Sequence, residues 1–90
     1  MSIKVRISPI LRRLDNIPDP LEIRGRSAAE CLHDLEVQFP NVRRWLRVEG
    51  GALRPQVLFF VNGKRVYSDE LASPLEDGDE LTITAAIGGG

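Results

Sequence analysis

The feature that most constrains the fold of this chain is a single well-marked helix with strand-like segments on both sides of it. Ser27 and Glu30 form a capping box, in which a hydroxyl and a carboxylate satisfy free backbone N–H groups at a helix start. The helix is therefore expected to begin at Ser27, and Pro40 ends it. Its apolar face has helical spacing and consists of Ala28, Cys31, Leu32, Leu35 and Phe39. A helix with one apolar face has to pack against another element, and the flanking strands supply it.

The segment before the helix has the period-two pattern of half-buried strands. Apolar and polar residues alternate over 3–8 until Pro9, which ends the pairing of a first strand. Residues 9–20 contain three prolines and an Asp-Asn pair, which predicts a loop, and a second short alternation follows at 21–24. This part of the chain therefore predicts two strands that pair with each other.

The segment after the helix predicts three more strands. Residues 57–61 are apolar throughout, and Asn62-Gly63 is the preferred pair for a tight turn into a strand at 64–67. The last strand is expected at 80–85, after a turn rich in Asp and Gly. The sequence therefore predicts an α+β fold, a sheet with one main helix across one face.

Size and charge exclude several classes of partner. A chain of 90 residues supports one small core, and 42% hydrophobic with 28% charged residues is typical of an ordinary globular domain. The formal net charge of −1 gives no field for phosphate backbones or an anionic membrane, so neither nucleic acid nor membrane is expected as a partner. The charge is uneven, because residues 69–90 contain six acids and no base.

The chain contains one cysteine and one histidine, which leaves little for metal or nucleophilic chemistry. Cys31 is expected in the core and His33 on the outer face of the same helix, so no metal site and no catalytic constellation are expected. A chain with one cysteine suits a reducing compartment. The first residues alternate as a strand does, where a signal peptide would have an apolar block, and we expect a cytoplasmic protein.

A short second helix is expected over 41–47. Trp45 is predicted to lie mostly buried at the edge of the core, because Val42 and Leu46 share its side. Three arginines, Arg43, Arg44 and Arg47, are expected on the solvated side. A basic cluster with an aromatic residue is also typical of an RNA-binding patch, which is the less favoured alternative.

The strand at 57–61 lacks alternation, so it either meets protein on both faces or leaves an apolar patch for a partner. Phe60 is the first candidate for the exposed side, together with Leu58, which shares its face. The alternative is that Phe59 and Phe60 both lie in the core.

The sequence given ends in an apolar residue and three glycines, Ile87 followed by Gly88, Gly89 and Gly90. Glycine has the largest ordering entropy and no side chain to bury, so we expect a domain over 1–87 and a flexible tail over 88–90. A tail without side chains can lie extended in a narrow enzyme channel and present its carboxylate to a reactive centre. The alternative is a frayed end without function.

Three stretches in this order resemble the ubiquitin-like sulfur carriers of the β-grasp fold, the MoaD, ThiS and CysO family. They are Phe-Val-Asn-Gly at 60–63 with Val66 three residues on, Leu-Glu-Asp-Gly-Asp-Glu-Leu-Thr-Ile at 75–83, and the final Gly89-Gly90. The resemblance covers essentially the whole chain. Such carriers often have a proline near Ala85, and here Gly88 adds a third glycine. The opening residues 7–12 and the length are closer to the CysO type than to the shorter thiamine type.

The resemblance implies a mixed sheet of four to five strands and a protein that is a substrate and not an enzyme. An adenylating enzyme of the ubiquitin-activating type would use ATP to activate the Gly90 carboxylate, and sulfur would then form a thiocarboxylate there. No cofactor would be bound. Gly88 and Gly89 would thread the channel, and Leu58, Phe60 and Ile87 would contact the partner. A downstream biosynthetic enzyme would accept the sulfur, and the chain alone would be a monomer.

Two other functions stay open at this point. A ubiquitin-like modifier would be joined through Gly90 to lysines of target proteins. A non-covalent β-grasp binding module would not need Gly89 and Gly90, and its RNA version would use the arginines of 41–47. The receiving pathway, of cysteine, molybdopterin or thiamine type, is also open.

Overall fold

The computed structural model describes residues 2–85, which form a five-stranded mixed sheet in the order β2-β1-β5-β3-β4. The central strand β5 (Glu80–Ala85) runs parallel to β1 (Ser2–Ile7) and antiparallel to β3 (Val57–Val61). The outer strands β2 (Leu21–Arg24) and β4 (Lys64–Val66) pair antiparallel with β1 and β3. The predicted strands are confirmed, and their order makes the last one the most enclosed.

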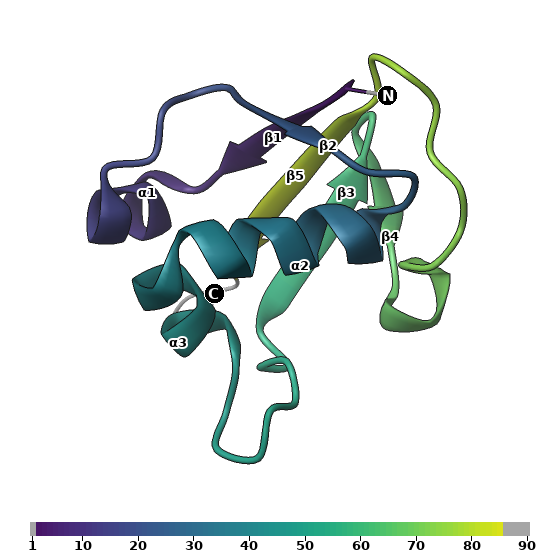
Figure 1. Cartoon of the computed structure of the whole chain (residues 1–90). Helices are drawn as coiled ribbons and strands as arrows, with labels where there is room; N and C mark the ends of the chain where they lie inside the picture. The colour runs from purple at the N-terminus through teal and green to yellow at the C-terminus, as the bar shows by residue number, and fades with distance from the viewer. Residues whose placement is uncertain (1, 86–90) are drawn as a thin grey trace.

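One main helix, α2 (Ala28–Gln38), crosses one face of this sheet (Figure 1). Two shorter helices, α1 (Pro9–Asp15) and α3 (Pro40–Leu46), pack against each other at one end, and a 3-10 helix, η1 (Ser68–Glu70), follows β4. The α+β class with one main helix across the sheet is therefore as predicted. Among residues 2–85, no helix has the length and apolar character needed to span a bilayer.

The core lies between α2 and the sheet and is built from the inward sides of the strands. Leu81 and Ile83 of β5 are fully buried, and so is Ile3 of β1. On the helical side, Cys31 and Leu35 of α2 are fully buried, as the apolar face of the capped helix predicts. The strongest periodic patterns in the sequence therefore supply the core.

The start of α2 uses the predicted capping residues with one difference. The Ser27 Oγ accepts a hydrogen bond from the Glu30 backbone N–H at 3.2 Å. The Glu30 carboxylate, however, accepts from the backbone N–H of Arg26 at 3.1 Å, one residue before the expected donor. Both side chains therefore still satisfy free backbone groups at this helix start.

The loop predicted over 9–20 is wrong in its first half, where the chain forms α1. Pro9 occupies the first helical position, where its missing N–H costs nothing. Leu11 is 1% exposed and anchors the helix in the core. The Asp15 carboxylate accepts the backbone N–H of Val42 at 3.1 Å and the side-chain amide of Asn41 at 2.9 Å, so α1 also caps α3. These stabilising contacts are tertiary, which is why local sequence signals did not predict the helix.

The predicted short helix forms as α3, but one of its arginines is not on the solvated side. Val42 and Leu46 are fully buried, and Trp45 is partly buried against the core. Arg47 turns inward and donates from Nε and Nη2 to the Glu36 carboxylate of α2, both at 2.7 Å. Glu36 is 5% exposed, so the Arg47 guanidinium compensates a buried charge instead of facing solvent.

Candidate functional site

The candidate site is the surface around the carboxyl end of β5. Ala85 is the last described residue and pairs with Val57 of β3. The predicted site residues Ile87, Gly88, Gly89 and Gly90 lie outside the described residues. The structure therefore describes the surface around Ala85, the residue after which these predicted site residues follow in the sequence.

The strand β3 alternates in burial although its sequence does not alternate in polarity. Val57 and Phe59 are 7% and 4% exposed and belong to the core, whereas Leu58 and Phe60 are only partly buried. In the register of the sheet, Leu58 lies opposite Thr84 and Phe60 opposite Thr82. The two predicted contact residues therefore share the sheet face away from α2, and only one of the two phenylalanines lies in the core.

An exposed aromatic residue and a guanidinium extend this surface toward β4, and the sequence reasoning did not single them out. Arg65 lies opposite Phe60 in the β3–β4 register. Its guanidinium carbon is 4.7 Å from the centroid of the Tyr67 ring, and Tyr67 is 57% exposed. Strand residues two positions apart lie on the same face of a sheet, so the sequence after the Asn-Gly turn could have predicted that Arg65 and Tyr67 share a face. The group Leu58, Phe60, Arg65 and Tyr67 is called the β3–β4 patch below.

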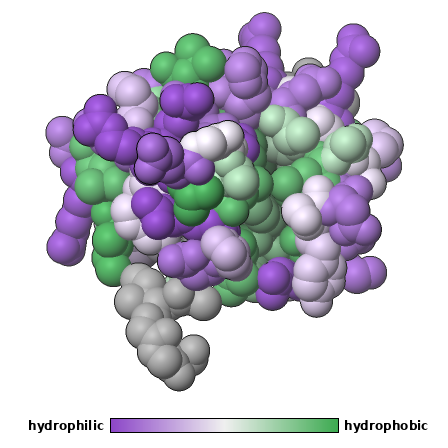
Figure 2. Space-filling model, turned by 90° about the horizontal axis from the view of Figure 1, so that it is seen from below, coloured by the Kyte–Doolittle hydropathy of each residue, from purple (hydrophilic) through white to green (hydrophobic). Residues whose placement is uncertain are grey.

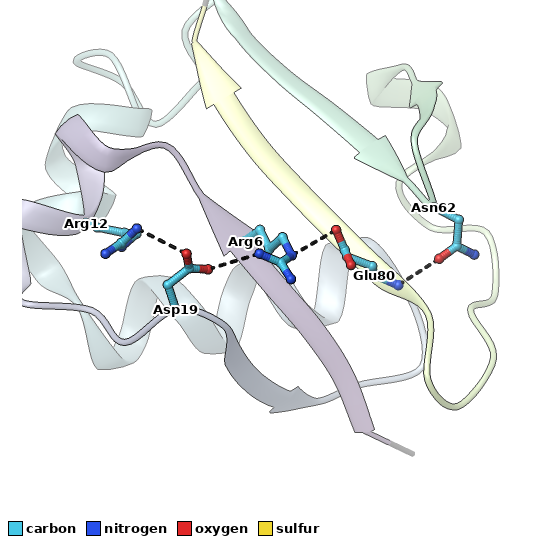
Figure 3. A network of polar contacts seen from close by, with 5 residues as sticks. All are labelled: Arg6, Arg12, Asp19, Asn62 and Glu80. Atoms are coloured by element: carbon cyan, nitrogen blue, oxygen red, sulfur yellow. Dashed lines mark hydrogen bonds and ion pairs between the residues drawn. The ribbon is translucent and has the colours of Figure 1, made fainter.

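The other half of this sheet face is occupied by charges that bind one another (Figure 3). The Arg6 Nε of β1 lies 3.0 Å from the Glu80 carboxylate of β5, and its Nη1 lies 3.7 Å from the Asp19 carboxylate. Asp19 also accepts from Arg12 Nη1 at 3.2 Å. The Glu80 backbone N–H donates to the Asn62 side-chain oxygen at 2.9 Å. Because these pairs are partly exposed they add little stability, but they leave the apolar part of the face on the β3 side.

Several acids of the last quarter of the chain serve the turn before β5. The Asp79 carboxylate accepts the Glu76 backbone N–H at 2.8 Å and the Asn62 amide at 3.0 Å, and these bonds lower the pKa of Asp79 below its ordinary value. Asp77 accepts the Ser2 backbone N–H at 2.7 Å. These carboxylates therefore hold the turn in place beside β1, in addition to giving this part of the surface negative charge.

The cysteine and the histidine lie where the helical pattern predicts. Cys31 is fully buried, and burial, together with the nearby carboxylates of Glu30 and Asp34, raises its pKa to about 11. A thiol that stays protonated at neutral pH is a poor nucleophile. His33 is exposed on the outer side of α2. Within the part of the chain that the structure describes, no three His, Cys, Asp or Glu side chains gather in a way that could hold a metal ion.

Comparison with protein families gives a match over most of the chain. The model of the ThiS family matches residues 11–90, which includes the three final glycines. No curated protein matches the chain.

Solved structures match the fold along its whole length. SAMP1 from Haloferax volcanii superposes with a TM-score of 0.84 at 17% identity, and each chain is covered completely. A chain in the crystal structure of the Amycolatopsis orientalis BexX/CysO complex superposes with a TM-score of 0.79 at 29% identity, covering 98% of this chain and 99% of that one. Mycobacterium tuberculosis CysO gives 0.77 at 28% identity, with 94% and 99% covered.

The mixed sheet, the single crossing helix and these matches define the ubiquitin-like β-grasp fold. The chain belongs to the ThiS family, within the MoaD, ThiS and CysO group of ubiquitin-like sulfur carriers.

Proposed function

We propose that the protein is a sulfur carrier whose Gly90 carboxylate is adenylated by an enzyme of the ubiquitin-activating type and then converted to a thiocarboxylate. The observation that carries the proposal is the family match, which runs from the β-grasp domain through the final Gly88, Gly89 and Gly90. In this role the protein is a substrate and not an enzyme, binds no cofactor of its own and acts as a monomer.

The proposed chemistry explains why activation is needed. A carboxylate is a poor electrophile, so an oxygen of Gly90 attacks the α-phosphorus of ATP, pyrophosphate leaves, and an acyl-adenylate forms. Sulfur at the oxidation level of hydrosulfide then attacks the carbonyl carbon, the bond to AMP breaks, AMP leaves, and a thiocarboxylate remains on Gly90. Its sulfur is nucleophilic, so a downstream biosynthetic enzyme can pass it to an acceptor without releasing sulfide.

The described part of the chain supports a docking role for the domain and a reactive role for its end. Cys31 is a buried thiol of raised pKa, and His33 is exposed on the outer side of α2. The β3–β4 patch, in contrast, offers a partly apolar surface with one guanidinium beside β5. An adenylating enzyme that binds this patch would hold the domain while Gly88 and Gly89 enter its channel.

The relatives named above give precedent for a protein partner. The Amycolatopsis orientalis relative was solved as a BexX/CysO complex. For the present chain we propose an adenylating enzyme and a sulfur-accepting biosynthetic enzyme as successive partners. The second partner would define the receiving pathway, of cysteine, molybdopterin or thiamine type.

Intact-mass measurement tests the proposal directly. The full chain is incubated with ATP, a sulfur source and its cognate adenylating enzyme, and the wild type should gain the mass difference between sulfur and oxygen at its C-terminus. Two variants serve as controls. Gly89→Val restricts backbone angles that glycine alone reaches freely and adds a side chain in the channel, so it should block the gain. One residue added after Gly90 moves the carboxylate and should do the same.

The same measurement separates the alternatives. Full sulfur gain in the extended chain or in Gly89→Val would refute the carrier proposal. Larger covalent adducts on lysines of other proteins, with no thiocarboxylate, would favour the protein modifier. If removal of Gly89 and Gly90 leaves every cellular phenotype unchanged, the non-covalent binding module is the better description.

A further inference from the structure

The helix that the sequence did not predict, α1, has two partly exposed apolar side chains on one side. Leu11 faces the core, whereas Ile10 and Leu14 are 54% and 41% exposed. Residues four apart lie on the same side of a helix, so these two side chains form one strip, called the α1 strip below. Single exposed aliphatic residues are ordinary on protein surfaces. The position of this pair in the fold is the relevant observation, because the pair lies near the end of β5.

The α1 strip begins where β5 ends. The strands β1 and β5 are parallel, with Ile7 opposite Ile83, and the Ser8 backbone N–H donates to the Ile83 carbonyl at 3.1 Å. Helix α1 starts at Pro9, the next residue. Figure 1 shows α1 at the end of the sheet toward which β1 runs. In Figure 2, hydrophobic surface is interspersed with hydrophilic surface along the left edge, the side that α1 occupies in Figure 1.

The length of the chain beyond β5 sets how close a partner has to come. Five residues follow Ala85 in the sequence, and fully extended they span at most roughly 17 Å. An enzyme that acts on the Gly90 carboxylate must bring its reactive centre within that distance of Ala85. Its surface therefore has to approach the end of the sheet at which α1 lies.

The surfaces on the two sides of β5 differ in polarity. On the β3 side, Leu58 and Phe60 of the β3–β4 patch lie opposite Thr84 and Thr82. On the β1 side, the outward surface at Arg6 and Glu80 is charged. Exposed apolar side chains follow on this side in α1. The α1 strip therefore offers apolar surface on the β1 side of β5, as the β3–β4 patch does on the β3 side. The exposed Arg13 lies between the two strip residues in sequence and favours acidic groups at the rim of the partner.

We propose, on the basis of the carrier function proposed above, that the α1 strip is a second docking surface for the adenylating enzyme that receives the tail. The enzyme contacts both sides of β5, the β3–β4 patch on one and the α1 strip on the other. The strip contacts no reacting atom. Its contribution is to the affinity of the enzyme for the carrier.

The test compares matched surface variants of the full chain. The variant Ile10→Ser/Leu14→Ser removes the strip, and Val37→Ser removes an aliphatic side chain that is 67% exposed on α2. Thiocarboxylate formation is followed by intact mass at increasing carrier concentration. Loss of the strip should raise the KM for the carrier about tenfold with kcat at saturation nearly unchanged, because truncated interface anchors cost this much. Val37→Ser should leave both constants unchanged, and the melting temperature of each variant checks that the fold is intact.

Each other outcome overturns a specific statement. An unchanged KM in the double variant, with normal sulfur gain in the wild type, would refute the docking role and leave the carrier function standing. An equal rise of KM in Val37→Ser would show that the strip is not a specific contact. If sedimentation shows a wild-type dimer that the double variant loses while KM stays unchanged, the strip joins two copies of this chain. Absence of sulfur gain in the wild type would overturn both proposals.

Discussion

Two adjacent phenylalanines of β3 allow the stability and the proposed docking function of this domain to be separated in one experiment. Phe59 is 4% exposed and packs in the core, whereas Phe60 is partly buried on the opposite face. The substitutions Phe59→Ala and Phe60→Ala remove the same atoms from neighbouring positions of one strand. Any difference between the two variants therefore reflects the face of the sheet on which each ring lies.

The burial of each ring sets the expected loss of stability. Truncation of a buried phenylalanine costs about 3–5 kcal/mol, because the transfer free energy is lost and a cavity remains. For Phe60, solvent can fill the space and only part of the ring is buried, so about 1–2 kcal/mol is expected. Domains of this size have a free energy of unfolding of about 5–13 kcal/mol. Phe59→Ala should therefore lose a large share of the free energy of unfolding, and Phe60→Ala should lose a small share.

Two measurements check this reasoning. Urea unfolding, followed by the fluorescence of the single tryptophan Trp45, gives the free energy of unfolding of each variant. Titration with the adenylating enzyme under conditions where both variants are folded gives the binding constant. Phe60→Ala should weaken binding by about tenfold or more, as truncation of an aromatic interface anchor does, and Phe59→Ala should change it little. A loss of 3–5 kcal/mol in Phe60→Ala with unchanged binding would place this ring in the core and refute the argument.

Three further predictions concern the inside of the domain. Arg47→Ala should cost about 2–4 kcal/mol in urea unfolding, because it leaves the buried Glu36 carboxylate unpaired, and Glu36→Gln/Arg47→Met should be less destabilised than the single variant. Gly25→Ala should also destabilise the fold, since its Cβ would lie 2.7 Å from the Cys31 Sγ, and Cys31→Ala should restore part of the loss if the sulfur is the cause. The pKa of Cys31, raised from 9.0 to about 11, favours the folded state below pH 9, so wild-type stability should fall between pH 9 and 11 more than that of Cys31→Ala. An equal fall in both would argue against this effect.

The strong local signals of the sequence were sufficient for most of the fold. The alternation over 3–8 and 80–85 predicted the two strands that form the parallel pair, and Asn62-Gly63 predicted the turn between β3 and β4. Both turn residues have positive φ, 51° and 82°, as the preferred hairpin turn requires. The apolar side of the capped helix predicted that Cys31 would be buried. These features depend on local spacing, which a single sequence contains.

The features that sequence reasoning missed depend on contacts between distant residues. Helix α1 has seven residues, too few to be stable alone, and it is held by Leu11 in the core and by Asp15 at the start of α3. Arg47 was placed on the solvated side because a short helix with three arginines usually presents them to water. Its partner Glu36, eleven residues earlier, explains the difference, and a charge on the inner side of α2 cannot be recognised from its own sequence position.

The central place of β5 is consistent with the two roles proposed for this domain, which are to hold the reactive end of the chain and to present docking surfaces. The strand pairs with β1 over residues 80–83 and with β3 over residues 81–85, and its inward residues Leu81 and Ile83 are fully buried. Its outward residues, in contrast, are Glu80, which is bound by Arg6, and two threonines next to the β3–β4 patch. A partner that binds the chain beyond Ala85 is therefore connected directly to the central strand of the sheet. The β3–β4 patch and the α1 strip, on either side of this strand, remain available for docking. In this arrangement the residues that stabilise the domain and the residues proposed to bind the partner are different, so selection can change the partner without changing the core.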